Sequence, residues 1–433
     1  MNQSVLSAVT AGILMLGTAT SAYAEPVEIS LWYSLHGPNR ALFEKIVADF
    51  NKQQTNVKVD LDHFSTQERL VNAGQKALSG DRKKPDLIQL FDTHAPEVIA
   101  DHKAMMPLYQ LLAKYPIKDA SWFRSKTTSF VRDAKGQLLA FPMMAEMPVM
   151  FYNLDAYRNA GLDPNKPAES WSELQAHLLQ LRNEGNSSCP YASSHQVNVH
   201  LENLAPMNDK LYLNPDNGFT GKQSPTFNFG TLYMRHLSLM RSWKKVDLMV
   251  HSADNDEPDA SFADGRCAVL TTTSSATGRL KDSGVRFGVA PLPFYPQESK
   301  VRHEPFVGGG ALWVTKDRPA ANHKAVAEFL RYLSTPAIAA KWHQETGYLP
   351  LTDAALRAAN VSYYDKTPGV RDMIQKAAAT KQKDSRGFRA RHYPKARTVL
   401  NAGYMRAITG EVPPMEALQT AKAAADRVIK TGQ

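Results

Sequence analysis

The stretch Pro26-Val-Glu-Ile-Ser-Leu-Trp-Tyr33 alternates apolar and polar side chains as a β-strand does. Apolar residues then recur at helical spacing over 41–51, a second strand is predicted over 57–61, a helix over 67–78 and a third strand over 86–91. Strands that alternate with helices in this way predict an α/β fold with a mostly parallel sheet flanked by helices. Ligands of such sheets bind outside the carboxyl ends of the strands, so the candidate ligand loops are 34–40, 64–67 and 92–96.

The length of 433 residues is too great for one hydrophobic core and predicts two lobes. Residues 139–152 form an apolar segment interrupted by Pro142 and Pro148, which predicts a crossing between lobes rather than a central strand. A capped helix is predicted from Ser170 to Asn183, strands over 287–292 and 310–315, and helices over 319–333, 336–346 and 415–429. We therefore expect a first lobe over 25–145, the main part of a second over 146–315, and a helical region over 316–433 that completes both.

The first 24 residues carry no charged side chain, contain a short apolar run and end in Ala22-Tyr23-Ala24. This pattern is typical of a signal peptide cleaved after Ala24, and the run is too short to span a membrane. We expect export to the periplasm, because no Cys stands at the cleavage site to carry a lipid.

The net charge of +9 belongs entirely to the chain after residue 24. Its Lys and Arg residues are dispersed, and no helix-turn-helix, zinc or RNA-binding signature accompanies them, which argues against nucleic acid as a partner. The charge is interpreted as general attraction of anions or simple solubility.

Cys189 and Cys267 are the only cysteines. In an oxidising compartment such a lone pair is often bridged, so a disulfide is favoured, and two buried thiols are the alternative.

Several segments carry a family resemblance: 152–164, Cys189-Pro-Tyr-Ala-Ser193, Leu201-Glu-Asn203, Gly265-Arg-Cys-Ala268, Phe306-Val-Gly-Gly-Gly310 and Gly347-Tyr-Leu-Pro350. Together they resemble the periplasmic glycerol-3-phosphate-binding proteins of ABC importers. The resemblance covers essentially all of the chain after residue 24. It implies two α/β lobes that close on a ligand in the cleft between them, a membrane permease with its ATPase as partners, and neither catalysis nor a cofactor in this subunit. We expect a monomer.

Ligand residues follow from the resemblance position by position. The phosphate side corresponds to Thr273 or Ser274, Gly309, Tyr348 and Arg397, and an Arg guanidinium can grip a phosphate through two parallel hydrogen bonds. On the glycerol side the family has Tyr, Glu, Ser and Trp, whereas this chain has Gln67, Asp92, Glu146 and His195. In the expected clamp, Gln67 and Asp92 lie on one lobe, and Thr273, Gly309 and Arg397 on the other.

A carboxylate at Glu146 would repel a nearby phosphate by roughly 1 to 4 kcal/mol at about 4 Å. A ligand that also carries a cation, such as glycerophosphocholine or glycerophosphoethanolamine, would instead be complemented by Asp92 and Glu146. Glycerol 3-phosphate and a glycerophosphodiester both remain candidate ligands.

Two other functions are weighed against this reading. An oligosaccharide binder of the same class is the stronger, because the fold accepts many ligands. A secreted phosphodiesterase is weaker, because no His-Glu-x-x-His, Gly-x-Ser-x-Gly or clustered Asp/His metal motif is present.

Overall fold

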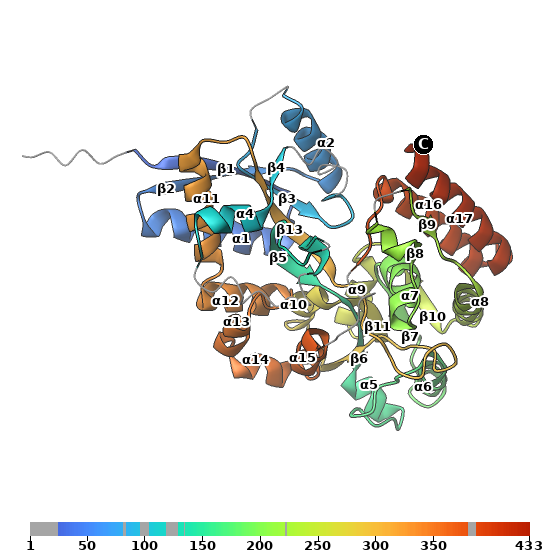
Figure 1. Cartoon of the computed structure of the whole chain (residues 1–433). Helices are drawn as coiled ribbons and strands as arrows, with labels where there is room; N and C mark the ends of the chain where they lie inside the picture. The colour runs from blue at the N-terminus through green and yellow to red at the C-terminus, as the bar shows by residue number, and fades with distance from the viewer. Residues whose placement is uncertain are drawn as a thin grey trace, which may run out of the picture.

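The computed structural model describes residues 25–80, 84–95, 104–117, 129–133, 135–220, 223–379 and 387–433. They form two α/β lobes, each built on one main sheet (Figure 1). The predicted signal peptide over 1–24 lies outside the described residues, as does Pro96 of the third candidate loop. No described helix is long and apolar enough to cross a membrane.

The first lobe contains the predicted βαβαβ unit, with β1 and β2 paired in parallel and β1 and β3 also parallel. Antiparallel β13 then joins β3 to β4 and β5, so the sheet is mixed rather than mostly parallel. Its elements are β1 Val27–Tyr33, α1 Gly37–Gln53, β2 Val57–His63, α2 Gln67–Leu78, β3 Leu87–Phe91, β4 Met105–Met106, α4 Leu108–Lys114, β5 Phe141–Glu146, β13 Gly308–Thr315 and α11 Ala320–Leu333.

The second sheet has the order β10-β7-β11-β6-β12 and is also mixed, because β6 runs antiparallel to both of its neighbours. Helices α6, α8, α16 and α17 pack on one side of its core, and α9 contacts β7 and β11. The elements are β6 Pro148–Asn153, α5 Leu154–Asn159, α6 Trp171–Asn183, β7 Cys189–Ser193, α8 Thr231–Lys245, β10 Met249–Ser252, α9 Glu257–Ala263, β11 Cys267–Thr273, β12 Phe287–Pro291, α16 Tyr393–Thr409 and α17 Pro414–Thr431.

Shorter elements connect the lobes and cover their edges. A π-helical turn spans Asn198–Glu202, and a 3-10 turn over Ser274–Ala276 leads directly into α10. The remaining segments are α7 Leu204–Met207, β8 Leu213–Asn214, β9 Thr226–Phe227, α10 Thr277–Leu280, α12 Pro336–Thr346, α13 Asp353–Ala358, α14 Val361–Lys366 and α15 Val370–Ala379, with 3-10 turns at Ser129–Val131 and Asp216–Gly218.

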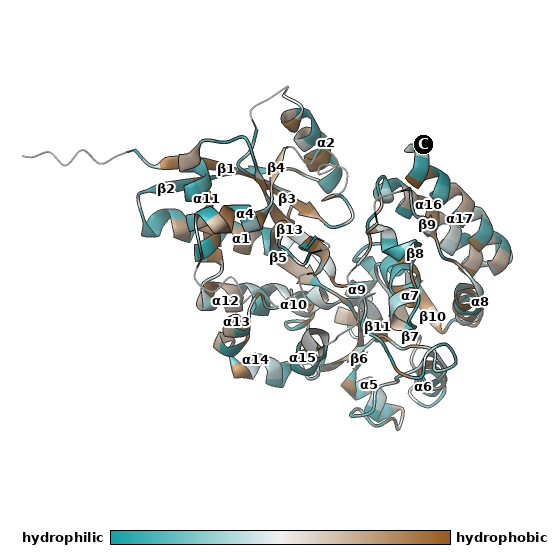
Figure 2. Ribbon diagram, in the orientation of Figure 1, coloured by the Kyte–Doolittle hydropathy of each residue, from teal (hydrophilic) through white to brown (hydrophobic). Residues whose placement is uncertain are grey.

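Local sequence explains the main boundaries. Thr66 caps α2 by accepting from the Arg69 amide, and Ser170 and Glu173 form the predicted capping box of α6. β3, an interior strand, is among the most hydrophobic segments of the first lobe (Figure 2), whereas the edge strand β2 alternates apolar and polar residues.

Two predictions about the lobe boundary are wrong in part. The chain does cross between sheets at Met147, but β6 is a central strand, which Pro148 tolerates because it is the first residue of that strand. Residues 308–315, assigned to the second lobe, form β13 of the first sheet. Gly309 therefore shares a lobe with Asp92 instead of facing it from the other.

Candidate functional site

A cleft of about 1040 Å³ lies between the lobes. It is lined by the ends of β3, β5, β11 and β13, by the turn after β1, and by segments next to α10, α12 and α16. Its walls combine aromatic rings with charged and hydroxyl side chains, which is the composition of a small-molecule site.

Two acids approach the cleft from the first lobe. Asp92 follows β3, and its amide donates to the Gly309 carbonyl at 2.8 Å, while its Oδ1 accepts from the Thr93 amide at 2.9 Å. Glu146 ends β5, with its Cα opposite that of Gly308. A Cβ on Gly308 would collide with the Asp92 carboxylate. Glycine at this position therefore makes room for an acidic group against the strand.

Gly309 is required for a second reason. Its φ of 109° is in the region that favours glycine, and a Cβ there would collide with the Met144 carbonyl and lie 3.3 Å from Cγ of Glu146. The run of glycines at the start of β13 thus shapes the wall between the two acids.

The pKa of Asp92 is raised to about 7, first by burial and then by the negative charges of Glu202 and Glu146, while hydrogen bonds from Thr93 and Gly309 oppose the shift. The centre of the cleft is consequently a region where a positive charge on a ligand would be stabilised.

Arg397, on α16, lines the cleft, and we call the part of the lining around it the Arg397 end. Its guanidinium donates to Glu202 Oε1 at 3.3 Å and to Asp254 Oδ1 at 2.8 Å, and the Tyr393 hydroxyl also donates to Glu202 at 2.5 Å. Burial alone would lower the pKa of Arg397, but the two carboxylates raise it above its usual range. This arginine therefore stays charged and has two acidic partners.

Arg279, on α10, also lines the cleft, and we call the part of the lining around it the Arg279 end. It forms ion pairs with Asp259 and, at 3.4 Å, with Asp256. Asp256 also contacts His195 Nε2 at 2.5 Å. Burial opposes a proton on His195, but the hydrogen bond and charge of Asp256 and the charge of Glu146 raise its pKa overall.

Hydroxyl groups gather at the Arg279 end. Thr273 and Ser275 line the cleft, and their side-chain oxygens lie 2.9 Å apart. Tyr348 lines it too, stacked on Trp342 with ring centroids 6.0 Å apart. Burial is the main reason that the pKa of the Tyr348 hydroxyl is raised. The negative charge of Glu146 also raises it, and the positive charge of Arg279 lowers it. These groups are donors suited to an anionic oxygen.

The structure brings most of the predicted ligand residues to the cleft. Those that line it are Asp92, Glu146, His195, Thr273, Gly309, Tyr348 and Arg397. Gln67 does not line it; its amide donates to Ser34 and, at 3.0 Å, to Gln89 behind the wall. Ser274 is buried against the interlobe crossing, where its amide donates to the Met147 carbonyl at 2.8 Å, and Ser275 reaches the cleft instead.

Sequence reasoning missed Arg279, Asp256, Ser275 and Glu202. Glu202 stands within the quoted segment Leu201-Glu-Asn203, and it occupies a π-helical turn, a feature frequent at functional sites, but no periodicity in the sequence marks such a turn. Arg279 lies six residues after Thr273 in a polar stretch that carries no motif.

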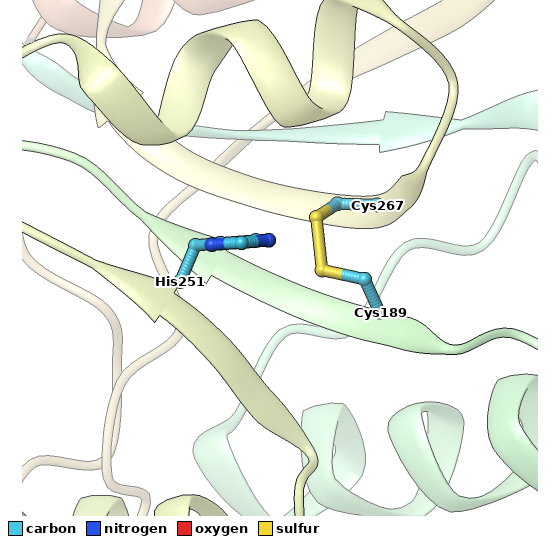
Figure 3. Close-up of side chains that lie close together, drawn as sticks. All are labelled: Cys189, His251 and Cys267. Atoms are coloured by element: carbon cyan, nitrogen blue, oxygen red, sulfur yellow. A yellow bond between two sulfur atoms is a disulfide. The ribbon is translucent and has the colours of Figure 1, made fainter.

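The two cysteines form a disulfide between paired positions of β7 and β11, the alternative that the compartment argument favoured. His251 of β10 points toward it (Figure 3), and the potential ligand atoms of the three side chains lie within 4.8 Å of one another. Because the two sulfurs are bonded to each other, no thiolate is left to bind a metal there.

Two lobes joined by crossing strands, with a polar cleft between them, define the class of exported solute-binding proteins. The sequence from 45 to 369 matches the model of the family described as bacterial extracellular solute-binding protein. The chain belongs to that family: it is the solute-binding protein of an ABC importer and is not an enzyme.

Relatives and solved structures agree with this assignment. The sn-glycerol-3-phosphate-binding periplasmic protein UgpB of Yersinia enterocolitica is 32% identical over 423 residues, covering 96% of this chain and 95% of its own. The UgpB protein of Brucella abortus is 28% identical over 431 residues, covering 99% and 97%.

Among solved structures, UgpB from Mycobacterium tuberculosis in complex with glycerophosphocholine superposes with a TM-score of 0.72 at 19% identity, covering 94% of this chain and 98% of its own. A solute-binding protein from Agrobacterium radiobacter in complex with ribitol gives 0.73 at 18% identity, covering 93% and 99%. At such identities these two show the shared fold alone.

Proposed function

We propose that this protein captures a glycerophosphodiester with a cationic head group, such as glycerophosphoethanolamine or glycerophosphocholine, and delivers it to the permease of its importer. The observation that carries the proposal is the presence of both charges in one cleft. Arg279 and Arg397 line it, and so do Asp92, Glu146 and Glu202. A zwitterionic ligand complements this arrangement, because each of its charges meets the opposite one.

Glycerol 3-phosphate is the simpler candidate, and the name of the relative from Yersinia enterocolitica supports it. It presents a phosphate monoester and no cation to the acids of the cleft. Ionised Asp92 and Glu146 would then remain without positive partners on the ligand, which weakens binding. We therefore place glycerol 3-phosphate second.

An oligosaccharide is favoured by one observation, the aromatic side chains in the lining, which include Phe219, Phe388 and Trp313. Sugar rings stack on such surfaces, while carboxylates accept from their hydroxyl groups. This ligand would leave the two arginines without a function in binding.

Calorimetric titration of the exported form, residues 25–433, with glycerophosphoethanolamine, glycerophosphocholine, glycerol 3-phosphate and maltose tests the proposal. We expect the two diesters to bind more tightly than glycerol 3-phosphate and maltose not to bind. At about 100 times the dissociation constant, the bound ligand should also stabilise the fold by roughly 2.7 kcal/mol. Binding of maltose alone would overturn the proposal.

A further inference from the structure

The two arginines of the cleft differ in the charge that surrounds them. The partners of Arg397, Glu202 and Asp254, are only 4% and 14% exposed, and Glu202 also acts on nearby Asp92. One positive charge therefore stands between two largely buried carboxyl groups, and a third, that of Asp92, lies near Glu202. A phosphate brought to Arg397 would meet more repulsion than attraction.

Arg279 has a more balanced environment. Its own partners are Asp256 and Asp259, but the His195 ring also contacts Asp256, and that contact favours a proton on the ring. Glu146 also acts on Arg279, so these two groups face three acids, of which Asp256 is 55% exposed and therefore screened by water. The Arg279 side chain is also 36% exposed, against 24% for Arg397, so more of it can reach a ligand.

Close backbone packing brings Arg279 and Tyr348 to the same wall. A Cβ on Gly278 would lie 2.5 Å from the Thr346 carbonyl carbon, and one on Gly347 would lie 2.7 Å from the Gly278 amide nitrogen and 2.7 Å from the Ser275 carbonyl oxygen. Only glycines allow the start of α10 to touch the turn that carries Tyr348.

The same wall carries neutral donors. Thr273 precedes the 3-10 turn that leads into α10, and Ser275 is within that turn. Together with the Tyr348 hydroxyl they provide three hydroxyl groups beside one guanidinium. An arginine that Asp256 and Asp259 already neutralise in part, with hydroxyl donors beside it, can bind the two charge-bearing oxygens of a phosphodiester reversibly.

From these contacts we infer that Arg279, with Thr273, Ser275 and Tyr348, holds the phosphate of the ligand, and that Arg397 serves as the counter-ion of Glu202 and Asp254. This inference rests on the proposed function. It places the specificity-determining residue, Arg279, on α10, whereas the family resemblance pointed to Arg397 on α16. The two helices lie in different parts of the molecule (Figure 1), so the assignment also orients the ligand, with its ammonium group toward Asp92 and Glu202.

Matched charge-neutral variants separate the two arginines. In Arg279→Gln/Asp259→Asn each member of an ion pair becomes an amide, which avoids leaving a buried charge alone. Arg397→Gln/Asp254→Asn is the control at the Arg397 end, where Glu202 loses its cation but keeps the hydrogen bonds donated by Tyr393 and Asn198. Glycerophosphoethanolamine is titrated into the unmodified protein and both variants, and circular dichroism melting curves establish that each is folded.

We expect the Arg279 variant to lose roughly 10- to 100-fold in affinity, the scale of a lost charge-assisted hydrogen bond, and the Arg397 variant to lose less than about 3-fold. Arg279→Lys, which keeps the charge without the fork of donors, should fall between. The reverse order of the two double variants would overturn the inference and leave the proposed function intact. If the unmodified protein fails to bind the ligand, the proposed function itself is wrong, and this inference with it.

Discussion

Arg279 and Arg397 line one cleft and each pairs with two acids, yet their surroundings differ. The partners of Arg397 are buried and joined by a tyrosine hydroxyl, which completes an internal network. One partner of Arg279, Asp256, is 55% exposed and shared with a histidine. The difference indicates that the burial and the acidic partners of an arginine, more than its presence in a cleft, determine whether it stabilises the fold or binds the ligand.

The largest effect should come from breaking the buried end. Arg397→Ala leaves Glu202 and Asp254 without their cation, and removing one partner of a buried pair is destabilising by about 3–5 kcal/mol. Urea unfolding of the ligand-free protein measures this loss. Arg279→Ala is the control; it leaves one buried acid, Asp259, without its cation, and the loss should be smaller because Asp256 reaches solvent. Equal losses would show that the two ends do not differ.

A second effect depends on pH. The pKa of Asp92 is raised to about 7, so this group is largely protonated at pH 6 and ionised at pH 8. Affinity for glycerophosphoethanolamine should therefore increase with pH, by at most about 10-fold per unit where Asp92 titrates. Calorimetry at pH 6, 7 and 8 measures the slope.

Asp92→Asn is the control for that slope. Protonation of His195 favours phosphate binding at low pH and so acts in the opposite sense, because the ring would add positive charge at the Arg279 end. The difference between the unmodified protein and Asp92→Asn isolates the carboxyl group. If both gave the same slope, Asp92 would have no part in recognising the cation.

Tyr348→Phe should weaken ligand binding by about 0.5–1.5 kcal/mol, the contribution of one hydrogen bond, with the ring and its stacking on Trp342 kept. Tyr393→Phe removes a hydroxyl that donates to Glu202 at the other end, so it should lower the melting temperature instead. Titration and melting of both variants test whether the Arg279 end determines ligand binding and the Arg397 end determines stability. An unchanged affinity in Tyr348→Phe would exclude that hydroxyl from the phosphate site.

The smallest effect separates two adjacent serines. Ser275→Ala should reduce affinity by less than about 1 kcal/mol, and Ser274→Ala should leave it unchanged, because the Ser274 side chain faces the Met147 amide at 3.3 Å. The same titration measures both. A loss confined to Ser274→Ala would mean that the turn after β11 presents the other residue to the ligand.

The sequence predicted the elements well where periodicity and capping agree, as in β1, α2 and α6. It failed where topology depends on contacts between distant segments. Nothing in Gly308-Gly-Gly310 indicates that β13 pairs with β3 of the first sheet, since that pairing is set by residues more than 200 positions away. Pro148 suggested an edge, but the first residue of a central strand tolerates proline.

The site was predictable only by resemblance. It led to Asp92, Glu146, Tyr348 and Arg397, which line the cleft. It could not reveal that Arg397 has two acidic partners, since Glu202 and Asp254 are nearly 200 and 143 residues away and neither follows a recognisable pattern. Assigning residues by resemblance is also not precise enough to distinguish Ser275 from its neighbour Ser274.

A crystal structure of the protein with bound glycerophosphoethanolamine tests the central claim most directly. The account predicts the phosphate within hydrogen-bond distance of Arg279 and Tyr348, and the ammonium group beside Asp92 and Glu202. A phosphate held by Arg397 with the ammonium group in solvent would contradict it.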